Sequence, residues 1–218
     1  MKFQNAANGV KKIFGAEILG LIGTICMIVT ALLGVIAYAA VKTESGEGLL
    51  FSGIGAAVFG IGGVVLLLIG YIIKIVGVNK ASNDEPSFKT ALFFIIFALI
   101  CSVGMSFFSG NEVIKTLLDS FNQVANLAVT VFIIAGIRNL ALRVNRNDID
   151  AKGSNLYKII VVIYALIIIS KIITAIFNNT TSSMIALIFV VIAGILQIVQ
   201  YFLYIAFLCK GKNMLAEN

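Results

Sequence analysis

The sequence contains no histidine, a single proline and few charged residues for its length. The absence of histidine excludes imidazole metal sites and histidine acid–base catalysis. Charged residues make up 12% of the 218 positions, about half of the roughly 25% that is typical of soluble domains. Because 60% of the residues are apolar, the chain could not cover its own surface in water. We therefore expect lipid to be its solvent and the bilayer its first partner.

Other chemical signals are also missing. The sequence has no glycine-rich phosphate loop and no paired carboxylates within one apolar run, so we assign no catalytic residue, metal or cofactor and do not expect an enzyme. The net charge of +6 would suggest nucleic acid in a soluble protein. Here the basic residues lie at the ends of apolar runs, where they orient a membrane protein instead. We therefore expect no nucleic-acid partner.

The three cysteines lie in or beside different apolar runs. Cys26, Cys101 and Cys209 show no metal-ligand spacing, and we interpret them as small packing residues. Acylation of Cys209 at the membrane edge is the alternative for that residue.

Long apolar runs are the main positive signal. A helix needs about 20 mostly apolar residues to cross a bilayer, and backbone groups in lipid must be hydrogen-bonded within the helix. The runs predict an all-α, polytopic transmembrane bundle that forms a single domain over residues 1–218. The expected spans are approximately 14–41, 49–78, 88–108, 113–144, 156–177 and 183–208. The first run is longer than the apolar core of a signal peptide, so we expect it to be retained.

The basic residues predict the orientation. Lysine and arginine concentrate in cytoplasmic loops, and with six spans and a cytoplasmic N-terminus only Lys42, Lys115 and Lys171 fall on or toward the other side. Both termini are then cytoplasmic. Abundant Ile, Lys and Asn suggest an AT-rich bacterial genome, so the bacterial cytoplasmic membrane is the expected location.

Small residues in the second span predict a close helix contact. They recur at steps of four or seven residues, and the positions expected in the contact are Gly53, Ala56, Gly60, Gly63, Gly70 and Gly77. Small side chains let helix backbones approach closely in lipid. The partner helix could belong to the same chain or to another subunit, such as a second copy in a homo-oligomer.

Polar side chains inside a membrane are costly and are candidate functional residues. Stripes on the fourth, fifth and sixth spans predict an outward-facing polar cavity lined by Asp119, Asn122, Asn126, Thr130, Lys171, Thr174, Gln197 and Gln200. In the alternative, Lys171 reaches the outer interface and the amides bond across helices. Near the expected cytoplasmic end of the first span, we expect Glu17 to pair with Lys11 or Lys12.

Short sequence similarities within the chain are compatible with three copies of a helical hairpin. Residues 69–72 resemble residues 135–138, for example, although apolar sequences also align by chance. The run Ile69–Gly77 followed by Phe88–Ala91 resembles a pattern in small uncharacterised multi-span bacterial membrane proteins, a resemblance that implies no function. In size and span number, the chain is also similar to the substrate-binding subunits of energy-coupling-factor vitamin transporters.

These observations favour a non-catalytic membrane component, such as a scaffold, a complex subunit or an immunity-type protein. The alternative is a small-solute transporter or channel component that uses the polar cavity between the fourth, fifth and sixth helices.

Overall fold

The computed structural model describes the backbone of residues 3–42, 46–108, 110–176 and 180–217, and side chains outside 40–51, 112, 168, 170–190 and 193. Within these ranges the chain forms six helices and no strand, which confirms the all-α prediction. The helices are α1 (Gln4–Lys42), α2 (Gly46–Ala81), α3 (Pro86–Phe107), α4 (Glu112–Arg143), α5 (Asn147–Ile176) and α6 (Thr180–Glu217).

Five helices, α1, α2, α3, α4 and α6, are long and apolar enough to cross a membrane within the described residues. The protein therefore has the features of a multi-pass membrane protein. The fifth predicted span, residues 156–177, lies partly outside the residues whose side chains are described.

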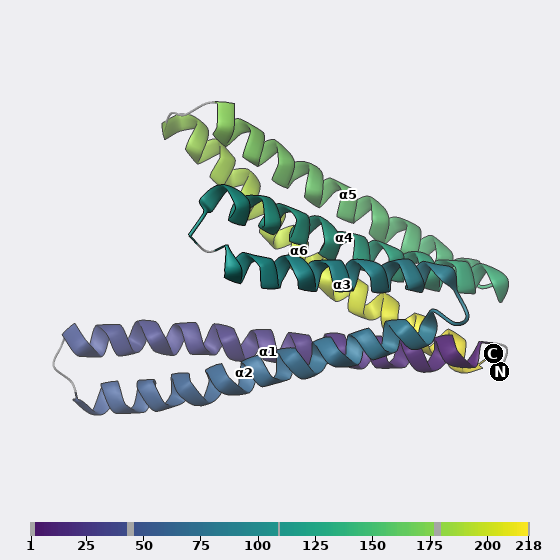
Figure 1. Ribbon diagram of the computed structural model, residues 1–218, viewed down its shortest axis with the longest axis horizontal. Helices are drawn as coiled ribbons and strands as arrows, with labels where there is room; N and C mark the ends of the chain where they lie inside the picture. The colour runs from purple at the N-terminus through teal and green to yellow at the C-terminus, as the bar shows by residue number, and fades with distance from the viewer. Residues whose placement is uncertain (1–2, 43–45, 109, 177–179, 218) are drawn as a thin grey trace.

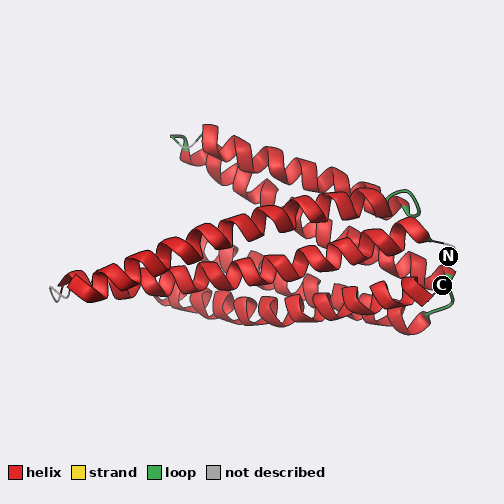
Figure 2. Ribbon diagram, turned by 90° about the horizontal axis from the view of Figure 1, so that it is seen from below, coloured by secondary structure: helices red, strands yellow, loops and turns green. Residues whose placement is uncertain are grey.

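The helices are arranged as three antiparallel hairpins, α1–α2, α3–α4 and α5–α6 (Figure 1). Both chain ends and the α2–α3 and α4–α5 connections lie at one end of the bundle, which we call the base. From the base, the α1–α2 hairpin and the α5–α6 hairpin diverge (Figure 1), and in a view turned by 90° the helices again converge toward the end that carries both termini (Figure 2). We call the diverging part the open half.

Three helices extend beyond the apolar runs at the base. α1 begins at Gln4, α5 begins at Asn147 and α6 ends at Glu217. The segments left between the expected spans, residues 79–87 and 145–155, are therefore largely helical, and between α2 and α3 and between α4 and α5 only residues 82–85 and 144–146 lie outside helices. Short helical segments are marginal alone in water, but packing against one another stabilises them here.

The buried core lies in the base. Phe88, Ile133, Ile137 and Leu140 are fully buried there, together with Val10 near the start of α1. They belong to one cluster to which all six helices contribute. Packing at the base therefore fixes how the three hairpins sit relative to one another.

A seam of small residues joins α1 to α2. Three positions on each helix, seven residues apart, meet in antiparallel order: Gly9 with Gly77, Ala16 with Gly70, and Gly23 with Gly63. A Cβ atom added at Gly77 would lie 2.8 Å from the carbonyl oxygen of Gly9. Only glycine allows this approach of the two backbones, as expected for helices that associate in lipid.

Local capping interactions define both ends of α4. The side chain of Asn111 accepts hydrogen bonds from the backbone N–H groups of Val113 and Ile114, which caps the N-terminus. At the other end, Asn145 has a positive φ of 56°, and the N–H of Arg146 donates to the carbonyl oxygen of Ala141 at 2.8 Å. This is a Schellman motif, in which asparagine tolerates the left-handed conformation. It lets α5 begin directly after α4.

Candidate functional site

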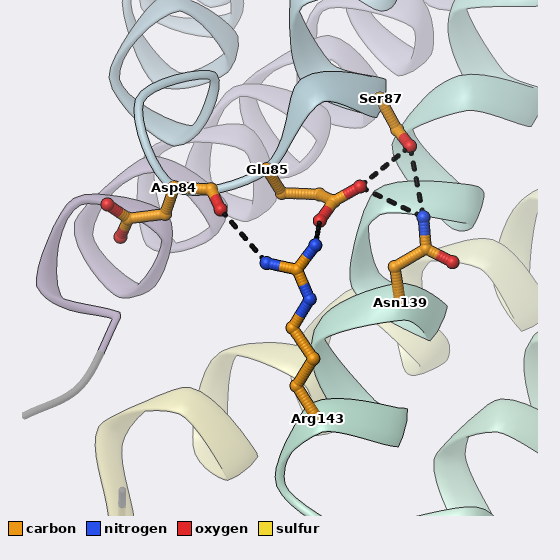
Figure 3. A network of polar contacts seen from close by, with 5 residues as sticks. All are labelled: Asp84, Glu85, Ser87, Asn139 and Arg143. Atoms are coloured by element: carbon orange, nitrogen blue, oxygen red, sulfur yellow. Dashed lines mark hydrogen bonds and ion pairs between the residues drawn. The ribbon is translucent and has the colours of Figure 1, made fainter.

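A network of polar contacts surrounds Glu85, in the α2–α3 connection at the base (Figure 3). Glu85 is 3% exposed, and its carboxylate lies 2.8 Å from the guanidinium Nη2 of Arg143 on α4. Asn139 donates to the other carboxylate oxygen at 2.9 Å and Ser87 donates to it at 3.0 Å. Because a buried carboxylate is costly unless paired and hydrogen-bonded, this network is a strong tie between α3 and α4.

The preceding residue, Asp84, attaches the start of α1 to the same connection. Its carboxylate accepts from the backbone N–H of Ala6 at 2.8 Å and from the side-chain amide of Asn5 at 3.2 Å. The first N–H groups of a helix have no partner within the helix, and the N-terminus favours negative charge. Asp84 therefore caps α1 from a distant part of the chain.

A second buried carboxylate, Glu17, joins three helices. It is 8% exposed, and its Oε1 lies 2.7 Å from Nζ of Lys74 on α2. The hydroxyl of Tyr201 on α6 donates to the Glu17 backbone oxygen at 3.0 Å and lies 3.4 Å from its Oε2. The expected pairing of Glu17 with Lys11 or Lys12 is wrong. Those lysines are exposed, and at five and six residues from Glu17 they lie on other faces of α1.

Tyr204 lies one turn further along α6 and differs from Tyr201. It is 2% exposed, and among the described residues its hydroxyl has no hydrogen-bond partner. An unpaired buried hydroxyl destabilises a protein. The hydroxyl of Tyr201 is therefore hydrogen-bonded, whereas within the described part of the chain the hydroxyl of Tyr204, one turn away, is not.

α4 and α5 are joined by the side chain of Arg138. Its Nε lies 2.7 Å from Asp150 Oδ1, and its guanidinium carbon lies 5.1 Å from the ring centre of Tyr157. Tyr157 in turn donates to the carbonyl oxygen of Val131 at 2.7 Å. The ion pair, the cation–π contact and the hydrogen bond fix α5 against α4 at the base.

Two cavities lie between α5 and α6 at the base. One, of about 320 Å³, is lined by Leu156 and Leu203 together with Lys152 and Lys210. The other, of about 290 Å³, shares the two lysines and is otherwise more polar. The lysines therefore stand between an apolar space and a polar one.

Charged groups beside these cavities influence one another. The hydrogen bond from Arg146, which lies 3.0 Å from Asp148, lowers the pKa of the Asp148 carboxyl. Lys152 lowers the pKa of Lys210, which lies beyond the last apolar run, through a contact between the two amines and through repulsion of like charge. The Lys152 and Lys210 amines therefore repel each other, and the nearby Asp148 carboxylate offsets only part of the effect on Lys210.

The polar side chains on the predicted face of α4 form most of their hydrogen bonds within the same helix. Gln123 donates to Asp119 at 2.7 Å, and Asn126 donates to Asn122 Oδ1 at 2.9 Å. Thr130 donates to the backbone oxygen of Asn126 at 3.2 Å. Asn122 also makes a contact to another helix, a 3.2 Å hydrogen bond to Ser102 on α3. The face therefore contacts α3, and Asp119 and Asn126 remain exposed.

The other residues of the predicted cavity are not brought to this face by any described contact. The side chains of Lys171 and Thr174 lie outside the described residues. On α6, Gln197 is exposed and Gln200 is half-buried. Both cavities described above lie at the base, with lining residues different from those predicted.

The predicted small residues of α2 divide into two groups. Gly63, Gly70 and Gly77 lie against α1 of the same chain, and Gly60 approaches the side chain of Thr30. At Gly53, in contrast, an added Cβ would meet no atom within 4 Å. Ala56 is half-buried.

Sequence reasoning missed the α1 half of this seam and the pairs at the base. Gly9, Ala16 and Gly23 recur at the same step of seven as the glycines of α2, a signal that could have identified the partner helix. The pairing of Glu85 with Arg143 has no such signal, because the two residues are far apart in sequence.

No known protein family, curated protein or solved structure matches the chain. The geometry of its own residues is therefore the basis for any functional conclusion.

Proposed function

We propose that the chain is a non-catalytic component of a membrane assembly, acting as a scaffold, a complex subunit or an immunity-type protein. One observation carries the proposal: Glu17 and Glu85, the two buried carboxylates among the described residues, are each paired with a cation from another helix. Acid–base catalysis needs a carboxyl that can exchange a proton with a substrate. Both of these carboxyls instead hold helices together.

We also propose that the base faces the cytoplasm. The helix ends at the base carry many basic residues: Lys11 and Lys12 lie near the start of α1, Arg143 ends α4, Lys152 lies near the start of α5 and Lys210 near the end of α6. Cytoplasmic ends of spans carry an excess of basic residues. Cysteine labelling with an impermeant maleimide tests this, after replacement of the three native cysteines. Asn83→Cys should react only after the cells are opened, and Gly110→Cys should react in intact cells. Labelling of both from one side would contradict the orientation.

The assembly role is tested by extracting the chain from its native membrane in copolymer nanodiscs and measuring the mass of the particle's protein content. A component of an assembly should be recovered with a stoichiometric second polypeptide or a second copy, above the 23.3 kDa of one chain. Recovery of a single copy alone at native expression level would contradict the proposal.

The second candidate function is transport of a small solute, favoured by the exposed polar side chains on α4. If Asn126 lines a water-filled path, Asn126→Cys should react with external maleimide as readily as Gly110→Cys. If the face lies in lipid or against a partner, Asn126→Cys should be as unreactive as Val124→Cys. Val124 is a suitable control because it is 58% exposed and apolar on the same helix.

A further inference from the structure

The larger cavity at the base is an amphipathic groove between α5 and α6. Its cationic end is formed by Lys152 and Lys210, and its apolar wall includes Leu156, Ile159 and Leu203. Ile159 is seven residues from Lys152 on α5, and Leu203 is seven residues from Lys210 on α6. At 1.5 Å per residue, both walls extend about 10 Å from the lysines into the apolar part of the bundle.

The two lysines carry charge that the described residues do not neutralise well. The only ion pair recorded for Lys152 is with Asp148, at 3.9 Å. Asp148 is bonded more closely to Arg146, at 3.0 and 3.4 Å. The mutual proximity of the lysines lowers the pKa of Lys210. An anion placed between the two amines would remove this repulsion.

We propose that the groove binds an anionic glycerophospholipid, with its phosphate between Lys152 and Lys210 and an acyl chain along Leu156, Ile159 and Leu203. Basic pockets between transmembrane helices at the cytoplasmic side are a recurring mode of recognition for anionic lipid headgroups.

The groove fits a lipid better than a soluble anion because the cationic pair continues directly into an apolar wall. A free phosphate would use the lysines and leave that wall empty. The adjoining polar cavity of about 290 Å³ is also lined by Arg146, Asn213 and the carboxylates Asp148 and Glu217, and it gives space for a hydrated headgroup substituent such as a hydroxyl group. The two cavities together match a molecule with an anionic centre, a polar end and an apolar end.

Native mass spectrometry of the purified full chain tests the proposal. The lipids are phosphatidylglycerol and phosphatidylcholine with identical acyl chains, and inorganic phosphate is the soluble competitor. Phosphatidylglycerol should bind the wild-type protein more tightly than phosphatidylcholine. Lys152→Gln combined with Lys210→Gln should weaken phosphatidylglycerol binding about 25-fold, since each lysine near an anionic lipid contributes roughly fivefold.

Two control variants separate this site from general attraction to a basic protein. Lys11→Gln combined with Lys12→Gln removes the same charge from exposed positions on α1 and should change binding less than twofold. Lys152→Arg combined with Lys210→Arg keeps the charge and should retain binding. Circular dichroism and thermal unfolding of each variant establish that the bundle is intact.

A third variant tests the apolar wall. Ala206 lines the groove on α6, and Ala206→Phe should fill the acyl space while leaving both lysines, so that phosphatidylglycerol binding falls severalfold. Equal loss in the two glutamine variants, or equal binding of the two lipids, would overturn the proposal. Displacement of the lipid by millimolar phosphate, with Ala206→Phe binding as wild type, would identify a soluble-anion site and also overturn it.

Discussion

The base and the open half of the bundle are built from similarly apolar helices but differ in what those helices contact. At the base, Val10, Ile13 and Val78 are fully buried. On the same two helices in the open half, Val35 is 68% exposed and Ile61 is 69% exposed. In lipid, an exposed aliphatic side chain has little free-energy cost, because acyl chains are as apolar as leucine. Packing within the protein therefore stabilises the fold mainly at the base.

Polar contacts follow the same division. The ion pairs of Glu17, Glu85 and Arg138 with other helices all lie toward the base. In the open half, the polar side chains of α4 bond largely within their own helix, and Asn122 also donates a hydrogen bond to Ser102 on α3. If this contrast is correct, substitutions of the same kind should have large effects at the base and small effects in the open half.

The largest expected effect comes from the glycine seam. Gly77→Val places side-chain atoms against the backbone of Gly9, and because backbone cannot move aside easily, we expect a loss of about 3 kcal/mol in unfolding free energy. Gly53→Val, on the same helix where an added Cβ meets nothing within 4 Å, should change it by less than about 0.5 kcal/mol. Reversible unfolding in mixed micelles measures both. Equal effects would remove the distinction between the halves.

A somewhat smaller effect is expected at the Glu85 network. Glu85→Ala leaves Arg143 and Asn139 without a main partner and should cost about 2–3 kcal/mol, the range for hydrogen bonds to charged groups. Because the Arg143 side chain is 48% exposed, water limits the loss. Asp119→Ala is the control, since Asp119 is exposed and bonds to Gln123 on its own helix. The same unfolding assay should detect almost no change for it.

Tyr201 and Tyr204 on α6 allow a comparison of a bonded and an unbonded hydroxyl within the base. Tyr201→Phe removes a hydrogen bond to Glu17 and should cost about 1 kcal/mol. Tyr204→Phe removes a buried hydroxyl that has no partner among the described residues, so it should leave stability unchanged or raise it slightly. A greater loss for Tyr204→Phe than for Tyr201→Phe would contradict the prediction that the Tyr201 hydroxyl stabilises the bundle and the Tyr204 hydroxyl does not.

The smallest expected effect is the pH dependence of the exposed Asp148–Arg146 pair. Because the hydrogen bond from Arg146 lowers the pKa of Asp148 below its ordinary 3.8 in the folded state, the contribution is fully present above that value. It is lost as the pH falls through the lowered pKa. In acid titrations of stability, Asp148→Asn should flatten this part of the curve slightly. A larger change above pH 5 would contradict the assignment.

The sequence predicted the helices but not their divergence. Long apolar runs require helices in lipid, and an even number of helices brings both chain ends to the base. The faces that contact protein and those that contact lipid are equally apolar, however, so hydrophobic periodicity does not distinguish Ile13, which is buried, from Ile28, which is 55% exposed. For the same reason, the outward splay of the hairpins could not be read from composition.

The candidate residues illustrate the same limit. The seven-residue spacing of Gly63, Gly70 and Gly77 was visible because it is local to one helix. The partner of Glu17 was not, because Lys74 comes close only through the packing of α1 on α2. Local patterns therefore predict which face of a helix packs, whereas distant ion pairs depend on the tertiary structure.

The even spacing of the α1–α2 seam leaves the alignment of the two helices ambiguous. A slide of seven residues, about 10 Å at 1.5 Å per residue, would again place small residues opposite small residues over part of the seam. The same slide would carry Lys74 away from Glu17 and the Asp84 carboxylate away from the start of α1. The seam holds the two helices close together but is compatible with more than one register. The charged contacts of Glu17 and Asp84 stabilise one of these registers over the others.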